Sequence, residues 1–286
     1  MQKKVYVFTG GASGLGLASA RNFVEEGVIL LADRNAEALE RVKAELAILG
    51  AEVYTAVIDV TDAATLEALA EYAASLGEIA AVVHTAGVTP ANTPCDAILK
   101  INALGTVYAV QAFYPRLAEG AAMVCFSSKA SYVFDTMPQL KPLIPMVEEL
   151  STHWNEPDFF DRLKSLITDV MQSPPEAQAG TAYMVSKYFV RQFVKMNVKR
   201  FCRKNCRIVS VSPGSYLTPM HQALLDNAPD QAAMDMASIP MQRWGHPYEM
   251  AALIKFLCSR GAGYITGVDI LADGGGSLTG GVPQID

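Results

Sequence analysis

The chain has few charged residues and no excess of positive charge. Only 18% of its 286 residues are charged, and 23 Lys and Arg stand against 29 Asp and Glu, a net charge of −6. A protein that holds nucleic acid mainly through phosphate contacts needs the opposite balance, so no nucleic-acid partner is expected. Hydrophobic residues make up 51% of the chain, a share typical of a sheet covered by helices on both faces. This composition favours a small-molecule ligand.

Cysteines are scarce and scattered, and long apolar runs are missing. The five cysteines, at 95, 125, 202, 206 and 258, show neither an even count nor paired Cys-x-x-Cys spacing, so neither a disulfide framework nor a metal site is predicted. The first apolar run, Val5 to Phe8, is too short for a signal peptide. No other stretch reaches the ~18 apolar residues of a membrane helix. We therefore expect a cytoplasmic protein with reduced thiols and no membrane partner.

Short apolar runs alternate with longer amphipathic segments, the pattern of repeated strand-helix-strand units. Ala36 to Leu49 shows the helical type best, because its apolar residues recur on one face. No linker divides the chain. The sequence thus predicts a single α/β domain over residues 1–286, a Rossmann-type doubly wound sheet of seven mostly parallel strands with helices on both faces. The expected strands are Val5–Thr9, Val28–Asp33, Val53–Asp59, Ile79–His84, Ala122–Ser127, Arg207–Ser212 and Val268–Ala272.

One segment, residues 132–180, interrupts this alternation. Its prolines exclude a single continuous helix or a central strand, and a helix is expected to begin near Asn155–Asp158. A structureless loop of that length is unusual in a compact domain. We therefore expect a largely helical insertion, either a lid near the site or an interface between subunits.

A glycine-rich sequence, Thr9-Gly10-Gly11-Ala12-Ser13-Gly14-Leu15-Gly16, follows the first expected strand and opens a helix. Glycines at 10, 14 and 16 permit a tight turn and close approach of backbone N–H groups to a pyrophosphate, which the helix N-terminus attracts. Asp33 ends the second strand, where a carboxylate can bind both hydroxyls of an adenosine ribose and repel a 2′-phosphate. Arg34 offers a 2′-phosphate an opposite charge. NAD is the predicted cofactor, with NADP the alternative.

With this glycine spacing and Asp33, the chain resembles the short-chain dehydrogenase/reductase family from Lys4 to Gly276, apart from the insertion. The resemblance implies further cofactor contacts: a pair at the adenine after strand three, a pair after strand four, and a segment beside the nicotinamide after strand six. The expected cofactor-binding residues are Gly10, Ser13, Gly14, Leu15, Gly16, Asp33, Arg34, Asp59, Val60, Ala86, Gly87, Tyr183, Lys187, Pro213, Gly214, Tyr216 and Thr218.

The sequence departs from the family at His84-Thr85, which stand where the family has two asparagines. Hydrogen bonds made by those asparagine side chains are therefore not carried over. His84 has two interpretations, a ligand or base, and a strand-end residue whose hydrogen bonds are satisfied within the fold.

Tyr183 and Lys187 are spaced i, i+4 at the start of a helical pattern, so they share one face. A tyrosine of pKa about 10 is a poor base near neutrality, but a nearby ammonium, helped by the positive nicotinamide, is expected to lower that pKa. The resemblance adds Ser128, with Ser127 as the fallback, to hold the substrate oxygen. It also adds Asn102, to hold a water that links the lysine to solvent. The expected catalytic residues are Asn102, Ser128, Tyr183 and Lys187.

These residues predict an NAD-dependent alcohol dehydrogenase or reductase. Tyr183 would take the proton of a secondary alcohol while hydride passes to C4 of the nicotinamide. The family also implies a homodimer or homotetramer. Two other functions stay open: a lyase or epimerase that recycles bound NAD, and a non-catalytic dinucleotide sensor.

The insertion bears on the substrate. Ser128 and Tyr183 lie 55 positions apart, a long separation for the family, and a similar insertion occurs in a branch that resembles bacterial 3α-hydroxysteroid dehydrogenase/carbonyl reductases. A steroid or another bulky hydrophobic alcohol is therefore the expected substrate. The apolar wall of its pocket is expected to come from Met137, Leu140, Leu143, Ile144, Met146 and Val147.

Overall fold

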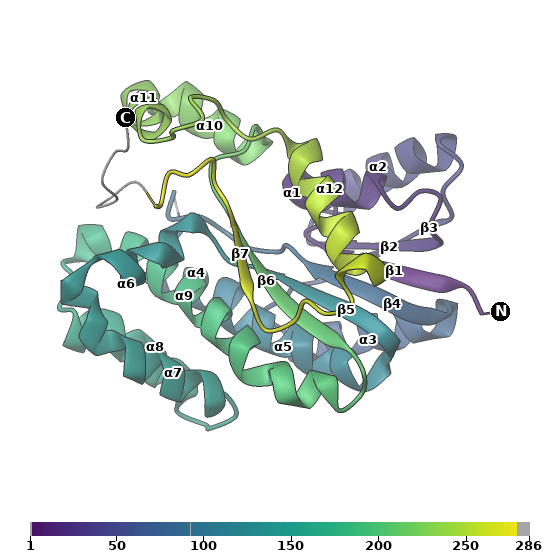
Figure 1. Ribbon diagram of the computed structural model, residues 1–286, viewed down its shortest axis with the longest axis horizontal. Coiled ribbons are helices and arrows are strands. Elements are labelled where there is room, and N and C mark those ends of the chain that lie inside the picture. The colour runs from purple at the N-terminus through teal and green to yellow at the C-terminus, as the bar shows by residue number, and fades with distance from the viewer. Residues whose placement is uncertain (1, 92, 279–286) are drawn as a thin grey trace.

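Seven parallel strands form one sheet in the computed structural model, which describes residues 2–91 and 93–278 (Figure 1). The strand order is β3-β2-β1-β4-β5-β6-β7, so the predicted doubly wound α/β fold is confirmed. Each strand lies where the sequence predicted one. The strands are β1 (Lys4–Thr9), β2 (Val28–Asp33), β3 (Val53–Val57), β4 (Glu78–His84), β5 (Leu117–Phe126), β6 (Arg207–Pro213) and β7 (Asp269–Ala272).

Helices cover both faces of the sheet, which explains why its central strands are nearly continuous apolar runs. In β2 only the last residue, Asp33, is not fully buried. One face carries α1 (Gly14–Arg21), α2 (Ala36–Ile48) and α12 (Pro247–Cys258), and the other carries α3 (Ala63–Leu76), α5 (Gly105–Phe113) and α9 (Pro175–Cys202). Helix α2 begins as the sequence predicts, because the side chain of Asn35 caps it by accepting the N–H of Ala38 at 3.0 Å.

The sheet has its switch point between β1 and β4. The chain runs outward from β1 through β2 to β3 and then returns to place β4 on the other side of β1. Ligands of doubly wound sheets bind beyond the carboxyl ends of the strands at such a point. Five parts of the expected site lie at or just after the carboxyl ends of strands, and so along this one edge. They are the glycine-rich turn, Asp33, the His84–Gly87 segment, Ser128 and the Pro213–Thr218 segment.

The insertion is folded and largely helical, as predicted. It contains α6 (Val133–Thr136), α7 (Ile144–Thr152) and α8 (Phe159–Ser165), which lie outside α9 together with the short α4 (Cys95–Leu99) (Figure 1). Aromatic contacts fix it there: the rings of Phe134 and Tyr188 stack at 4.2 Å, and those of Phe159 and Phe189 lie 5.4 Å apart. Burying these rings accounts for much of the insertion's stability.

Two expectations about the insertion need correction. It ends before α9, which begins at Pro175 rather than near Tyr183, because proline is favoured in the first turn of a helix. The expected apolar wall is also wrong in part. Leu140, Leu143 and Val147 are buried in the core that the insertion forms with α9, since they carry its packing. Of the other three, Met137 and Met146 are exposed.

A second helical segment, α10 (Pro219–Asn227) and α11 (Pro229–Ala237), lies beyond the carboxyl ends of the strands, at the top of Figure 1. It connects β6 to α12. Among the described helices, none combines the length and the apolar character that crossing a bilayer requires.

Candidate active site

The glycine-rich turn between β1 and α1 has a backbone that side chains would strain. Gly10 has φ +67° and Gly14 has φ +53°, both in the left-handed region. A Cβ on Gly16 would lie 2.3 Å from the carbonyl oxygen of Gly10. The predicted glycines therefore let α1 pack directly against the turn.

The N-terminus of α1 is open to an anion. Ser13 occupies the N-cap position and is exposed, yet its side chain makes no capping hydrogen bond. The first N–H groups of a helix have no partner within the helix and sit at its positive end. Leu15 is half-buried in this first turn, and the Cβ of Thr218 lies 3.9 Å from where a Cβ on Gly14 would be. A dinucleotide pyrophosphate fits this cradle.

Asp33 stands at the rim of the same turn. Its carboxylate accepts the backbone N–H of Ala12 at 3.2 Å and that of Asn35 at 3.1 Å. These bonds hold the side chain at the carboxyl end of β2 beside the glycine-rich turn. Its remaining acceptor capacity suits the hydroxyls of a ribose.

Asp59 and Val60, expected at the adenine, follow β3. The carboxylate of Asp59 is exposed and accepts the N–H and the hydroxyl of Thr61, at 2.8 and 2.7 Å. These bonds lower its pKa, and the charge of Arg34 contributes a smaller lowering. Val60 is buried against the core, which leaves only its backbone for a cofactor contact.

Gly87 is the point at which Asn102 and Lys187 meet. A Cβ on Gly87 would lie 3.1 Å from Oδ1 of Asn102 and 3.2 Å from Nζ of Lys187. Ala86 is equally close to the glycine-rich turn, with its N 2.9 Å from where a Cβ on Gly10 would be. The segment after β4 thus joins the expected cofactor site to the expected catalytic residues.

Asn102 is held in a π-helical turn, Lys100–Leu104, between α4 and α5. Its side chain is 1% exposed. It accepts the N–H of Val88 at 2.9 Å and donates to the carbonyl of Val88 at 3.1 Å and to the hydroxyl of Ser186 at 3.3 Å. π-helical turns occur often at functional sites, and this one keeps the asparagine beside Lys187.

Tyr183 and Lys187 lie one turn apart in α9, at the end of β5. Lys187 is buried, its Nζ donates to the carbonyl of Phe126 at 2.9 Å, and it lies 5.9 Å from the centre of the Tyr183 ring. Ser128 lies close enough to Tyr183 to lower the pKa of its phenol. The structure therefore brings the four expected catalytic residues together, with Asn102 reaching the others at Lys187.

The expected lowering of the Tyr183 pKa is wrong for the chain by itself. Burial of the phenol raises its pKa, and Ser128 offsets only part of that rise. Burial is thus the main cause, and Nζ of Lys187 donates to the carbonyl of Phe126 rather than to the phenol. Burial also lowers the pKa of Lys187, to about 8. The charges that stabilise a phenolate at this site therefore have to outweigh the effect of its burial.

The two serines after β5 make different hydrogen bonds. The hydroxyl of Ser127 donates to the carbonyl of Lys187 at 2.8 Å and is buried. The hydroxyl of Ser128 accepts the N–H of Ala130 at 3.2 Å, as the cap of a 3-10 turn, which leaves its proton for another acceptor. Ser128 is thus the serine that can hold a substrate oxygen, and Ser127 positions α9.

These bonds predict different results for the two alanine variants. Ser128→Ala is expected to lower kcat about 100-fold with little change in stability, because it removes a donor to the developing charge. Ser127→Ala is expected to lower the free energy of unfolding by about 1–2 kcal/mol, since it removes a buried hydrogen bond to the carbonyl of Lys187. Steady-state kinetics and urea unfolding of both variants check this, and equal kinetic losses would contradict the assignment.

The segment expected beside the nicotinamide is held between β7 and the turn before α12. A Cβ on Gly214, which follows Pro213, would lie 2.6 Å from the backbone after β7. Tyr216 pairs with Gly245 in an isolated bridge, and burial raises its pKa to about 12. The hydroxyl of Thr218 accepts an N–H of the first turn of α10 at 3.3 Å. Its position near Gly14 places this segment at the glycine-rich turn.

Comparison with known proteins agrees with this geometry. The family model described as short chain dehydrogenase matches residues 4–138, and that described as Enoyl-(Acyl carrier protein) reductase matches residues 166–277. The stretch between them lies within the insertion. The chain is 30% identical over 270 residues to the short-chain dehydrogenase/reductase bsc3 of Alternaria brassicicola, covering 93% of each chain. The chain belongs to the short-chain dehydrogenase/reductase family.

Other members of the family are also similar. The 2,5-dichloro-2,5-cyclohexadiene-1,4-diol dehydrogenase LinX of Sphingobium indicum is 28% identical, over 96% of each chain. The 7alpha-hydroxysteroid dehydrogenase of Bacteroides fragilis is 27% identical, over 96% of this chain and 94% of its own. The structure of the Pseudomonas aeruginosa RhlG/NADP complex superposes with a TM-score of 0.72 at 23% identity, over 96% of each chain. As a short-chain dehydrogenase/reductase, the protein is an oxidoreductase that uses a nicotinamide dinucleotide and acts on alcohol- or ketone-type substrates.

His84, where this dehydrogenase/reductase departs from the family pattern, is 1% exposed at the end of β4. Its Nδ1 hydrogen-bonds the hydroxyl of Thr9 at 2.8 Å, while its Nε2 has no partner among the described residues. Burial, with a smaller contribution from Lys187, lowers its pKa to about 3, so the ring is neutral. Thr85 replaces the second asparagine and donates to the carbonyl of Thr9 at 2.7 Å. The interpretation of His84 as a strand-end residue with satisfied hydrogen bonds therefore holds for Nδ1 but not for Nε2, which has no partner among the described residues.

This burial predicts a loss of stability in acid. Between pH 6.5 and about 3 the unfolded chain protonates His84 and the folded chain does not, so stability falls as pH falls. From pH 7 to pH 5 the loss is about 2 kcal/mol. His84→Asn should remove it, and His153→Asn, at an exposed histidine, should not. Urea unfolding at the two pH values tests this, and an unchanged loss in His84→Asn would contradict it.

Apart from its charge, nothing in the sequence assigned Lys129 to the site. Lys129, the residue after Ser128, forms an ion pair with Asp235 of α11. The sequence feature that could have identified it is a lysine just beyond the end of a buried strand. Its partner lies 106 positions away, and sequence patterns do not reveal such a pairing.

Proposed function

We propose that this dehydrogenase/reductase interconverts a secondary alcohol and a ketone with NAD. The observation that carries the proposal is the meeting of Ser128, Tyr183 and Lys187 at the carboxyl end of β5, with Asn102 against the lysine. Their hydroxyl, phenol and ammonium groups are those that proton transfer to and from an alcohol oxygen requires.

The residues of the chain divide the work as follows. Ser128 donates a hydrogen bond to the substrate oxygen and holds it against the Tyr183 hydroxyl. Tyr183 accepts the alcohol proton during oxidation and returns it during ketone reduction. Lys187 stabilises the phenolate through its charge, and Asn102 fixes the backbone of Val88 beside it. The glycine-rich turn Gly10–Gly16, Gly87 and Gly214–Thr218 would hold a nicotinamide dinucleotide, which would supply the hydride chemistry.

The choice of NAD over NADP rests on Asp33. Its carboxylate lies where the ribose of an adenosine would bind, and a 2′-phosphate there would meet a like charge. Arg34, the alternative partner for such a phosphate, interacts with Asp59. RhlG, a structural relative, was solved with NADP, so both cofactors have to be compared directly.

A single substitution tests this choice. Asp33→Ser is expected to lower the ratio of kcat/KM for NAD+ to that for NADP+ about 100-fold, because it removes the repelling charge and leaves Arg34 in place. Glu37→Gln, an exposed carboxylate in the first turn of α2, is the control. An unchanged ratio in Asp33→Ser would assign the selection to another residue.

For the substrate we propose a bulky alcohol with a largely apolar skeleton, of the steroid type. Apolar side chains stay exposed on the segments that border the site, among them Met137, Leu217 and Met220. Methionine adapts to irregular apolar surfaces. The relative from Bacteroides fragilis is named for a hydroxysteroid.

Assembly as a homodimer or homotetramer and a cytoplasmic location stay predictions.

The deciding experiment is NADH formation from NAD+, with NADP+ in parallel, across secondary alcohols from small aliphatic ones to hydroxysteroids, with Tyr183→Phe as the blank. Turnover of bulky apolar alcohols with NAD+ is the expected result. If NAD+ binds but no alcohol is oxidised, the dehydrogenase function is contradicted, and NAD that stays bound through purification would then favour the lyase or epimerase.

A further inference from the structure

A polar cluster joins the catalytic serine's neighbour to the helices above the site. Nζ of Lys129 donates to Oδ1 of Asp235 at 2.5 Å and to the hydroxyl of Ser215 at 3.2 Å. That hydroxyl in turn donates to Oδ2 of Asp235 at 2.5 Å. The lysine and aspartate side chains are 29% and 18% exposed. Three segments thus meet here: the turn after β5, the loop after β6, and α11.

The cluster retains hydrogen-bonding capacity that the described residues do not use. An ammonium has three N–H donors, and those of Lys129 go to Asp235 and Ser215, which leaves one. His221 of α10 lies within electrostatic reach of Lys129 and Asp235. It is 8% exposed, and its buried Nε2 has no partner among the described residues. Burial lowers the pKa of this ring, so it is neutral and one of its nitrogens carries a proton.

The cluster lies beside the expected position of the reacting oxygen. Lys129 directly follows Ser128, which lies close enough to Tyr183 to lower the pKa of its phenol. Ser215 directly follows Gly214 and precedes Tyr216, in the segment expected at the nicotinamide. An alcohol whose oxygen lies between Ser128 and Tyr183 therefore has its carbon skeleton bordered by Lys129 and by α10 and α11.

The charge of the cluster decides what it can accept. Asp235 already neutralises Lys129 at close range, so a substrate carboxylate would bring a second negative charge to one ammonium and lose its hydration in doing so. An uncharged hydroxyl or carbonyl oxygen accepts the remaining N–H without that cost. Asp235 thus disfavours the binding of anionic substrates, because its negative charge repels theirs.

We propose that Lys129 and Asp235 determine substrate specificity by binding a second, uncharged oxygen of the substrate and by excluding a carboxylate at that place. The substrate class is then a diol or a hydroxyketone on a bulky apolar skeleton. This inference rests on the proposed alcohol oxidation and adds the group that the enzyme recognises beyond the reacting one.

Three matched probes test it: cyclohexanol, 1,4-cyclohexanediol and 4-hydroxycyclohexanecarboxylate, each oxidised with NAD+. The wild type is expected to prefer the diol to cyclohexanol by about 10- to 100-fold in kcat/KM, the worth of a hydrogen bond to a charged donor, and to disfavour the hydroxy acid. In Lys129→Met the ratio of diol to cyclohexanol should fall towards one. In Asp235→Asn, kcat/KM for the hydroxy acid should rise at least about 10-fold, because the ammonium is no longer neutralised.

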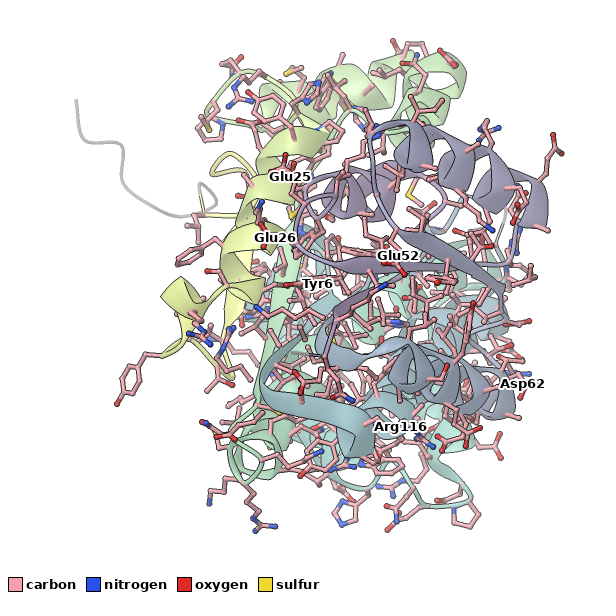
Figure 2. All side chains as sticks on the ribbon, turned by 90° about the vertical axis from the view of Figure 1, so that its right-hand side faces the viewer. Tyr6, Glu25, Glu26, Glu52, Asp62 and Arg116 are labelled. Carbon is pink, nitrogen blue, oxygen red and sulfur yellow. The ribbon has the colours of Figure 1, made fainter. Side chains whose placement is uncertain are left out.

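The control is an ion pair far from the site. Lys255 of α12 lies 2.7 Å from Glu26, which is labelled beside that helix in Figure 2, and Lys255→Met and Glu26→Gln should leave all three values unchanged. Lys129→Met leaves the partly buried carboxylate of Asp235 without its ion pair, with only the hydrogen bond from Ser215. If it melts early by circular dichroism, the double variant Lys129→Met with Asp235→Leu, which removes both charges, replaces it and should show the same fall in the ratio.

The outcomes separate this inference from the proposed function. Wild-type oxidation of all three probes at equal rates, or ratios that Lys129→Met and Asp235→Asn leave unchanged, overturns the inference and leaves the dehydrogenase. If none of the three is oxidised by protein that does oxidise a hydroxysteroid, the inference is overturned and the dehydrogenase stands. If the protein binds NAD+ but oxidises neither these probes nor a hydroxysteroid, both are contradicted.

Discussion

Tyr183→Phe is expected to lower kcat for alcohol oxidation about 1,000-fold or more while leaving NAD+ affinity within about threefold of the wild type, which is within the range that general acid–base catalysis contributes. The change removes one oxygen and keeps the ring that packs in α9. That oxygen lies close enough to Ser128 for the serine to lower its pKa, and the ammonium of Lys187 lies 5.9 Å from the ring centre. Single-turnover kinetics and a fluorescence titration with NAD+ give the two values separately.

Tyr188→Phe is the matched control for this loss. Tyr188 lies on the same helix, five residues further along. Its ring stacks on that of Phe134 in the insertion, away from the expected catalytic residues. Its variant should keep wild-type turnover. Turnover above about 10% of the wild type in Tyr183→Phe would mean that another group accepts the proton, and the assignment of Tyr183 would then be wrong.

The cofactor end of the site was predictable from sequence because its causes are local. The glycine-rich turn needs φ angles near +60° at Gly10 and Gly14, and Asp33 ends a strand whose hydrophobic run is visible. The i, i+4 spacing of Tyr183 and Lys187 is equally local. The start of α9 at Pro175 was not predicted, because the prolines of residues 132–180 were interpreted only as excluding a continuous helix, although proline also starts helices.

Properties that depend on burial escaped prediction. The pKa of Tyr183 follows mainly from its desolvation, and Lys187 makes its hydrogen bond to Phe126 instead; neither can be counted along the chain. The expected apolar wall failed for a similar reason. An amphipathic pattern shows that Leu143 and Val147 face something apolar, but whether that is a ligand or a neighbouring helix depends on the packing of α9. The pair formed by Lys129 and Asp235 requires the fold as well.

Lys187→Met is expected to lower kcat/KM about 100-fold or more and at the same time to stabilise the protein. Nζ of Lys187 lies 5.9 Å from the centre of the Tyr183 ring, and a charge about 6 Å from a phenolate stabilises it by about 3 kcal/mol at an effective dielectric constant near 20, which corresponds to about 100-fold in rate. The expected contact of Lys187 with the cofactor adds to the loss. The same ammonium is 5% exposed and has one hydrogen bond to a protein carbonyl and no ion pair among the described residues.

The stabilisation follows from that burial. The pKa of Lys187 falls to about 8 in the folded chain, against about 10.4 in the unfolded chain, so holding the ammonium at neutral pH costs about 3 kcal/mol at most. Methionine has nearly the same length and no charge, and it gives up only the hydrogen bond to Phe126, worth about 1 kcal/mol. We therefore expect Lys187→Met to raise the free energy of unfolding by about 1–2 kcal/mol at pH 7 in the absence of cofactor.

The pH dependence distinguishes this cause from better packing. Between pH 8 and about 10.4 the unfolded chain binds more protons than the folded chain at this lysine, so wild-type stability rises with pH in that window. From pH 7 to pH 9.5 the rise is about 2 kcal/mol, and it should be missing in Lys187→Met but present in Lys195→Met, an exposed lysine of the same helix. Urea unfolding at both pH values measures the difference between variants, in which other titrating groups cancel. A Lys187→Met protein that is more stable at pH 7 yet keeps the wild-type rise would show that packing, and not the buried charge, is responsible. In that case Lys187 would not have the lowered pKa at which its neutral and charged forms are both populated near neutral pH.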